Sequence, residues 1–282
     1  MLHSRSDRWH ACACLSIFLS SGLLVPARVL FAAEPIVLGD DLQVLPIAEG
    51  LYLVIHHFPT SCNSLIVRCG RRDFVWVDTP CTDDATRVVH EWLRRTFADA
   101  DPNLIEINTG FHNDNLGGNG YLIAHGIPCY GSDQTPKLIA ERWEQTKQKV
   151  LPYYAQAGED IREAFVNQKL VAPNRLYPLA EGLTLEVGGE SVEVFFPGPS
   201  HTPDNVVVFF NNRGVLYGGC MVKALTAGTP GFVGDADMAA WPASLEKVRD
   251  RFPDARLVIP GHGAADDLAL IEHTIKLCRQ AQ

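Results

Sequence analysis

The chain has 282 residues and a formal net charge of −9 at pH 7, and 46% of its residues are hydrophobic. This composition supports a packed core and argues against intrinsic disorder. The net negative charge argues against a nucleic-acid partner, because a nucleic-acid surface needs basic residues that displace counterions from phosphates.

Residues 1–33 are typical of a secretory signal peptide. Two arginines give a positively charged start, and the apolar run that follows is too short to span a bilayer. Small residues at Ala27 and Ala33 place the cleavage site after 27 or 33. The alternative is a retained membrane anchor. We expect export to the periplasm and a mature chain, residues 34–282, that forms one domain without membrane attachment.

Strands begin the mature chain. Short apolar runs bounded by Gly, Pro or Asp predict buried strands at 51–55, 63–69 and 73–78. A helix is predicted over 83–97, with Thr82 as its N-cap and two aspartates in its first turn.

Strands and helices then alternate again. A strand at 104–109 runs into the sequence GFHNDNLGGNG, and helices are predicted at 115–125 and 133–149. The next strands have the sequences LTLEV, VEVFF, VVVFF and VLYGG. The last helices are predicted near 238–251 and 264–279, with the strand ARLVIP between them. This order predicts an α/β protein, an αββα sandwich of two similar halves.

Four segments that follow strand-like runs carry residues suited to binding a metal. They supply His112 and Asp114 first, and then His201, Cys220 and His262. Imidazole, thiolate and carboxylate groups are the ligands that zinc prefers. A single His in such a loop is weak evidence, but four such segments predict a metal centre where the strand ends meet.

In this order, the four segments resemble the metallo-β-lactamase superfamily over nearly the whole mature chain. The family's leading motif is H-x-H-x-D, and the sequence here is G-F-H-N-D. The resemblance implies one zinc site at His112 and His201. It implies a second zinc site at Asp114, Cys220 and His262.

Cys220 also indicates the subclass. Glyoxalase-like and RNA-processing members have a bridging Asp at this position and a His directly after the motif's Asp, where this chain has Asn115. Both features favour the β-lactamase subclasses B1 and B2. Lys223 falls where those enzymes hold the Lys that binds the substrate carboxylate. The resemblance therefore implies hydrolysis of the amide bond of β-lactam antibiotics, which are small molecules. We expect the protein to be a monomer.

The chain departs from the family at Gly110, where subclass B1 has His and subclass B2 has Asn. The first zinc site can then draw only on His112 and His201, and water must complete it. We expect two Zn²⁺ ions, with this first site the weaker. If only the second site is filled, Asp114 or His201 is the candidate catalytic base.

The resemblance to subclass B2 around the motifs, and the short loop HHFPTSCN, predict a preference for carbapenems. Phe232 stands where subclass B1 has an Asn near the substrate carbonyl. Asp78 ends an apolar strand and is expected behind the metal site, with a simple strand-end cap as the alternative. Cys62 and Cys81 flank the same region, and whether they pair is left open by the sequence.

Two other functions compete with β-lactam hydrolysis. One is hydrolysis of a lactone, thioester or phosphodiester by another enzyme of the superfamily. The other is a catalytically weak relative that only binds zinc or a small molecule, for which the loss of a ligand at Gly110 is the one favourable feature.

Overall fold

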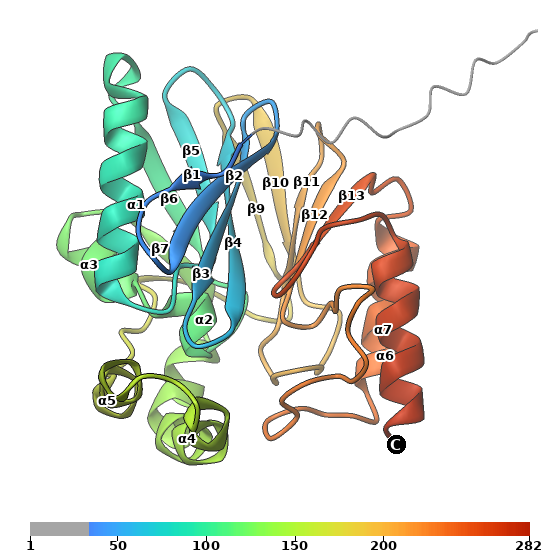
Figure 1. The fold of residues 1–282 in the computed structure, drawn as a ribbon. Helices are drawn as coiled ribbons and strands as arrows, with labels where there is room; N and C mark the ends of the chain where they lie inside the picture. Colours follow the sequence, from blue (N-terminus) through green and yellow to red (C-terminus); the bar gives the residue numbers. More distant parts are fainter. Residues whose placement is uncertain (1–33) are drawn as a thin grey trace, which may run out of the picture.

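The computed structural model describes residues 34–282, so the predicted signal peptide lies outside the described residues. Two β-sheets pack face to face between helices, which is the predicted αββα sandwich (Figure 1). The first sheet has eight strands in sequence order: β1 (Ile36–Val37), β2 (Leu42–Ala48), β3 (Leu51–His57), β4 (Ser61–Arg68), β5 (Asp73–Val77), β6 (Asn103–Ile107), β7 (Cys129–Ser132) and β8 (Arg175–Tyr177). The second sheet has five strands in the spatial order β13 (Leu257–Pro260), β12 (Val215–Gly219), β11 (Val207–Phe210), β10 (Glu190–Phe195) and β9 (Leu183–Val187).

Both sheets mix antiparallel and parallel pairs. Strands β5 to β8 pair in parallel in the first sheet, and β12 and β13 pair in parallel in the second. The carboxyl ends of parallel strands lie at the same edge of a sheet, where ligands usually bind. The loops after β6, β12 and β13 are therefore brought together at one end of the sandwich.

Helices cover both outer faces and one end of the sandwich (Figure 1). The helices beside the first sheet are α1 (Asp83–Thr96), α2 (Asn113–Leu116) and α3 (Asn119–Ala124). Those at the lower end in Figure 1 are α4 (Thr135–Val150) and α5 (Glu159–Asn167), with the short 3₁₀ helix η2 (Leu151–Tyr154) between them in sequence. A second 3₁₀ helix, η1 (Ala98–Ala100), follows α1. The outer face of the second sheet carries α6 (Trp241–Arg251) and α7 (Ala269–Gln280).

The hydrophobic core has three layers because side chains alternate along each strand. Leu65 and Val67 of β4 face the second sheet, whereas Ile66 between them packs in the layer that contains residues of α1. In β11, Phe210 faces the first sheet and Phe209 packs toward α6 and α7. Each layer of the core is thus formed by side chains from a sheet that pack against the facing sheet or against the outer helices.

The structure confirms the predicted helix after the third strand, with Thr82 accepting a hydrogen bond from the amide of Ala85. The single helix predicted over 115–125 is wrong, because Gly117 and Gly118 separate α2 from α3. A Cβ atom at Gly117 would overlap the carbonyl of Cys81, so only glycine allows the two backbone segments to pack this closely.

The helix predicted over 264–279 begins only at Ala269, since Asp266 first forms a β-bridge with Val258. The helix predicted near 238–251 begins at Trp241. Seven elements were not predicted from the sequence: β1, β2, β7, β8, α5 and the two 3₁₀ helices η1 and η2.

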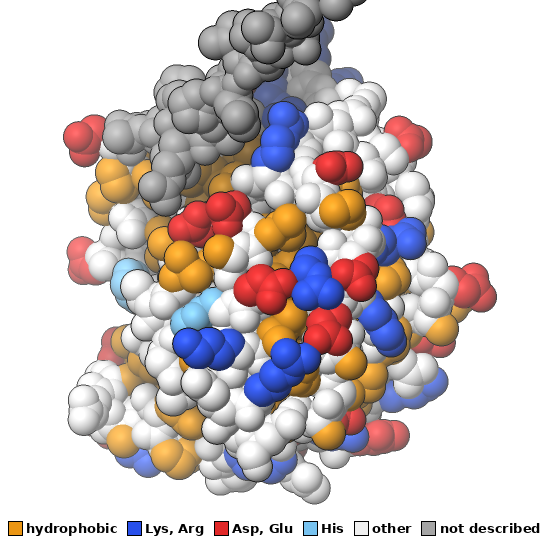
Figure 2. Space-filling model, turned by 90° about the vertical axis from the view of Figure 1, so that its right-hand side faces the viewer, with side chains coloured by type: hydrophobic (Ala, Val, Ile, Leu, Met, Phe, Trp, Pro, Cys, Tyr) orange, Lys and Arg blue, Asp and Glu red, His pale blue; other side chains and the backbone are white. Residues whose placement is uncertain are grey.

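Acidic and basic side chains are interspersed on the face that carries α6 and α7 (Figure 2). Ion pairs join Arg249 to Glu272 and Arg279 to Glu246 across the two helices. Within residues 34–282, no helix combines the length and the apolar character that crossing a membrane requires.

Candidate metal centre

All five predicted ligands lie at one end of the sandwich. His112 is the N-cap of α2 and Asp114 lies in its first turn, in the connection that follows β6 of the first sheet. His201 lies between β10 and β11, Cys220 directly follows β12, and His262 follows β13. A cavity of about 370 Å³ is lined by four of them, while Cys220 lies buried beneath its wall.

Asp114, Cys220 and His262 form a compact triangle. The Cys220 Sγ atom lies 3.2 Å from Asp114 Oδ2 and 3.6 Å from His262 Nε2, and His262 Nε2 lies 3.2 Å from Asp114 Oδ2. Ligand atoms around a tetrahedral zinc ion, at bond lengths of about 2.0–2.3 Å, are separated by about 3.3–3.6 Å. The triangle therefore fits zinc and leaves a fourth position for water or substrate.

Contacts behind this triangle orient its ligands. His262 Nδ1 lies 2.7 Å from the carbonyl oxygen of Ser61, which can only accept, so Nδ1 carries the proton and Nε2 is free to bind a metal. Asn63 donates to the carbonyls of Pro260 and Gly263 and so fixes the loop that carries His262.

The three groups of the triangle shift one another's pKa values. Burial raises the pKa of Cys220 to about 11. Burial alone would lower the pKa of His262, but Cys220 and Asp114 outweigh it and hold that pKa well above its usual value. Burial alone would raise the pKa of Asp114, but the hydrogen bond with His262 outweighs burial and lowers this pKa. A divalent cation would displace the protons that these groups hold.

His112 and His201 face each other, with ring centroids 5.1 Å apart. His112 Nε2 lies 3.0 Å from Asp235 Oδ2, which leaves Nδ1 for a metal. Burial, and then the charge of Lys223, lowers the pKa of His201, so the neutral imidazole that a metal needs is favoured. Among residues 34–282, no other His, Cys, Asp or Glu completes a cluster of three with this pair.

Gly110 leaves no room for a side chain. A Cβ atom there would lie 2.7 Å from Asn205 Nδ2 and 3.1 Å from Asn115 Oδ1. Asn205 is held in place by its hydrogen bonds to the carbonyl of Thr109 and the amide of Thr202. The space beside Gly110 is therefore occupied by buried amide side chains.

Asp78 lies beneath the ligand loop. Its buried carboxylate accepts hydrogen bonds from the amide and hydroxyl of Thr109, both at 2.8 Å, and from Asn115 Nδ2 at 2.9 Å. Burial raises the pKa of Asp78 to about 7, although these three hydrogen bonds act to lower it. Asn115 Nδ2 is also 3.9 Å from Cys220 Sγ, so Asp78 reaches the centre through the loop and Asn115.

The cavity beside the ligands combines one cation with an apolar wall. Lys223 is 7% exposed, lines the cavity, and holds its ammonium 5.4 Å from the ring centroid of Trp241. Phe232, with its ring centroid 5.7 Å from that of His112, belongs to the apolar part of the lining. Other residues of that wall include Phe58, Trp143, Val150, Tyr153 and Tyr154.

Asp235 and Thr146 were not among the residues predicted from the sequence. Asp235 accepts hydrogen bonds from His112 and, at 2.7 Å, from Thr146 of α4. These hydrogen bonds outweigh the upward effect of burial and lower the pKa of Asp235 to about 2. The sequence gives only a weak signal for this role, an acidic residue two positions after Val233 in a glycine-containing loop.

Comparisons with known proteins agree with this geometry. The family profile described as "Metallo-beta-lactamase superfamily" matches residues 32–262. A "Metallo-beta-lactamase type 2" of Bacteroides fragilis is 28% identical over 271 residues, which cover 94% of this chain and 96% of that protein. The solved structure of a metallo-beta-lactamase from Pontibacter korlensis is similar with a TM-score of 0.69 and 29% identity, over 84% of this chain and 99% of that one. The structure of DIM-1 metallo-beta-lactamase gives a TM-score of 0.71 and 28% identity, over 86% and 99%.

Proposed function

This chain belongs to the metallo-beta-lactamase superfamily, and on that basis we propose that it is a zinc-dependent hydrolase of β-lactam antibiotics. The observation that carries the proposal is the triangle of Asp114, Cys220 and His262, whose spacing suits zinc, next to a cavity that contains the buried cation Lys223. Relatives named metallo-beta-lactamase type 2 support the same substrate class.

Bound zinc supplies Lewis acidity and lowers the pKa of water toward neutrality. The residues of the chain supply orientation and charge. Lys223 binds the carboxylate of the substrate, because a buried ammonium in the cavity needs an anionic partner. Asp235 keeps the ring of His112 in one orientation. Asp114 and His201, which line the cavity, are placed to accept a proton if only one zinc ion is bound.

We propose that the enzyme binds two zinc ions, with the pair of His112 and His201 forming the weaker site that water completes. The experiment measures zinc content and imipenem turnover together, before and after dialysis against a mild chelator. Activity that falls as the weaker zinc leaves supports this proposal. One zinc ion with full activity contradicts it and assigns the chemistry to the triangle. Bound zinc without turnover of any β-lactam overturns the proposed function.

We propose further that carbapenems are the preferred substrates. The loop between β3 and β4 is short, and the aromatic residues of α4 and η2 wall the cavity on one side. This enclosure favours a β-lactam with small substituents. Steady-state values of kcat/KM for imipenem, benzylpenicillin and a cephalosporin test the proposal, and higher values for benzylpenicillin would contradict it.

The same assays separate the rival functions. A lactone or thioester hydrolase would turn over those esters and leave imipenem intact, and a binding-only relative, which Gly110 favours, would turn over neither. We also propose export to the periplasm and a monomeric state. Cell fractionation tests the first, and sedimentation of the purified protein tests the second.

A further inference from the structure

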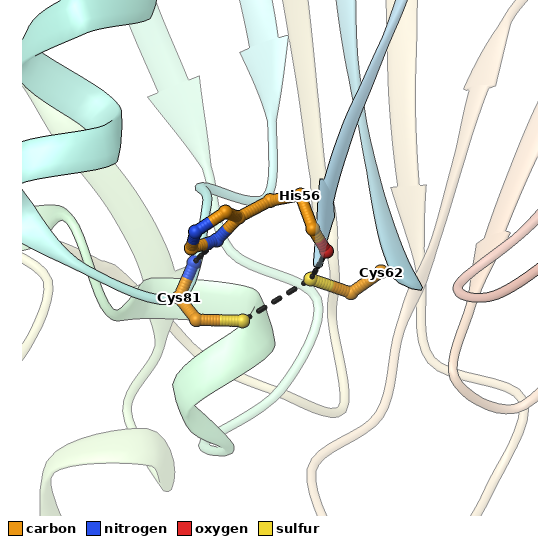
Figure 3. Close-up of side chains that lie close together, drawn as sticks. All are labelled: His56, Cys62 and Cys81. Carbon is orange, nitrogen blue, oxygen red and sulfur yellow. Dashed lines mark hydrogen bonds between the residues drawn. The ribbon is translucent and has the colours of Figure 1, made fainter. Parts of the chain in front are cut away.

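A second cluster of metal-type or nucleophilic side chains lies outside the predicted ligand set. It consists of His56 on β3, Cys62 on β4 and Cys81 in the loop before α1 (Figure 3). All three side chains are buried, and the two Sγ atoms are 3.1 Å apart. Both cysteines also line the cavity that contains Asp114 and His262, so small molecules in the cavity have a route to them.

The geometry favours a sulfur–sulfur bond over a metal. Two thiolates on one tetrahedral zinc ion would hold their sulfurs about 3.8 Å apart, and the observed separation is shorter. The His56 Nδ1 atom accepts a hydrogen bond from the amide of Cys81 at 3.1 Å, so the lone pair that a metal would use is already engaged (Figure 3). A disulfide bond is about 2.05 Å long, so the two sulfur atoms would have to move about 1 Å closer together to form one.

We propose that Cys62 and Cys81 are a redox-active thiol pair that forms a disulfide by exchange with a low-molecular-weight disulfide. Cys62 loses its proton to water, and its thiolate attacks one sulfur of the reagent, which releases one thiolate and leaves a mixed disulfide. Cys81 then gives its proton to the thiolate released in the first step, and its sulfur attacks the Cys62 sulfur and releases the second thiolate, which takes up a proton from water. Two thiols of the protein are oxidised, and one disulfide is reduced to two thiols.

The surroundings of Cys62 favour its role as the attacking group. Its hydrogen bond with Cys81 lowers its pKa to about 6, against the upward effect of burial, and His56 acts in the same direction. The pKa of Cys81 is raised by the same hydrogen bond and by burial. The thiolate is the nucleophile in such exchange, so Cys62 is expected to react first.

The bond would tie together two segments that support the metal centre. Cys62 follows Ser61, whose carbonyl accepts from His262, and precedes Asn63, which fixes the same loop. The carbonyl of Cys81 packs directly against Gly117 of the turn after α2. The cross-link would close the segment between residues 62 and 81, which includes β5.

The test uses the full chain, purified under reducing conditions and then incubated with hydroxyethyl disulfide. We expect peptide mapping without reduction to recover one cross-linked species that joins the peptides of Cys62 and Cys81. Closing a loop of this length should raise Tm by about 6–12 °C, a shift that dithiothreitol reverses. Thiols that both stay free under excess reagent, or a mixed disulfide at Cys62 that never resolves, would overturn the proposal.

Two variants complete the test. Cys62→Ser should abolish the cross-linked species, and Cys69→Ser should retain it, because Cys69 is free and its sulfur donates a hydrogen bond to the backbone carbonyl of Val67, not to another cysteine. A zinc ion that is lost in Cys62→Ser and kept in Cys69→Ser would instead identify a metal site and overturn the proposal. The peptide map of the unaltered chain decides the question even if Cys62→Ser does not fold.

Discussion

At the scale of single residues, the proposed ligands are oriented by neighbouring groups that are not themselves proposed ligands. His262 is oriented by the carbonyl of Ser61, and His112 by the carboxylate of Asp235. The ligand types could be predicted from the sequence because imidazole, thiolate and carboxylate groups follow strand ends. Asp235 could not be, because its partner lies 123 positions away and only the folded chain brings them together.

Replacing Asp235 by Asn should weaken the site at His112. The neutral amide removes the negative charge that lies against His112, and it cannot accept hydrogen bonds from His112, Thr146 and Lys149 equally well. We expect metal affinity or imipenem turnover to fall by about 10–100-fold, measured by competition with a chromophoric chelator and by steady-state kinetics. Asp237→Asn is the control, because Asp237 is exposed and caps the amide of Ala240. Equal losses in both variants would remove the role assigned to Asp235.

Replacing Gly110 by Ala tests whether this position is filled. The added methyl group must displace Asn205 and strain Asn115, so we expect unfolding in urea to become easier by about 1–3 kcal/mol. Gly228→Ala is the matched control, since nothing lies within 4 Å of a Cβ there. A stable Gly110→Ala variant would mean that the loop has room for a ligand side chain.

At the scale of elements, the strands whose apolar runs are bounded by Gly, Pro or Asp were predicted close to their true limits. The strand of sequence VLYGG matches β12 fully. The short parallel strands β7 and β8 were missed because they have only four and three residues and little periodicity. The helix over 115–125 was overestimated because its two glycines pack against Cys81 and Thr86, contacts that depend on tertiary structure.

Helix α4 contacts the metal centre through Thr146, which donates to Asp235. Thr146→Val keeps the shape and removes this one hydrogen bond, so we expect a loss of metal affinity of about two- to tenfold. Combined with Asp235→Asn, its effect should be less than additive, because both changes break the same contact. Thr86→Val serves as the control, because the Thr86 hydroxyl is buried without a partner among the described residues. Fully additive effects would show that α4 does not act through Asp235.

At the scale of the whole molecule, the candidate metal centre lies between the two sheets. Asp114 lies in α2, which follows β6 of the first sheet, whereas Cys220 and His262 follow strands of the second. The sandwich and its ligand end could be predicted from the order of strands and helices. The cavity wall could not be predicted, because Tyr153 of η2 meets Phe232 only through the packing of segments that are distant in the sequence.

Metal affinity should depend on pH because the metal competes with protons. The raised pKa values of Cys220, about 11, and of His262 mean that the metal-free groups hold protons at neutral pH. Affinity should therefore fall as pH falls from about 8 to 6, by about tenfold per pH unit for each proton released. Competition titrations at several pH values measure this slope. An affinity that does not change with pH would contradict it.

Because the proposed ligands follow strands of both sheets, a bound ion should affect how long the protein resists proteolysis in a cell. An ion held by Asp114, Cys220 and His262 stabilises the docked halves, by about 4 kcal/mol when zinc is a thousandfold above its Kd. When zinc is scarce, the stabilisation by the bound ion is lost, and the two sheets separate from each other more often. Proteases cleave opened chains, so the amount of this protein should follow the zinc supply of its surroundings.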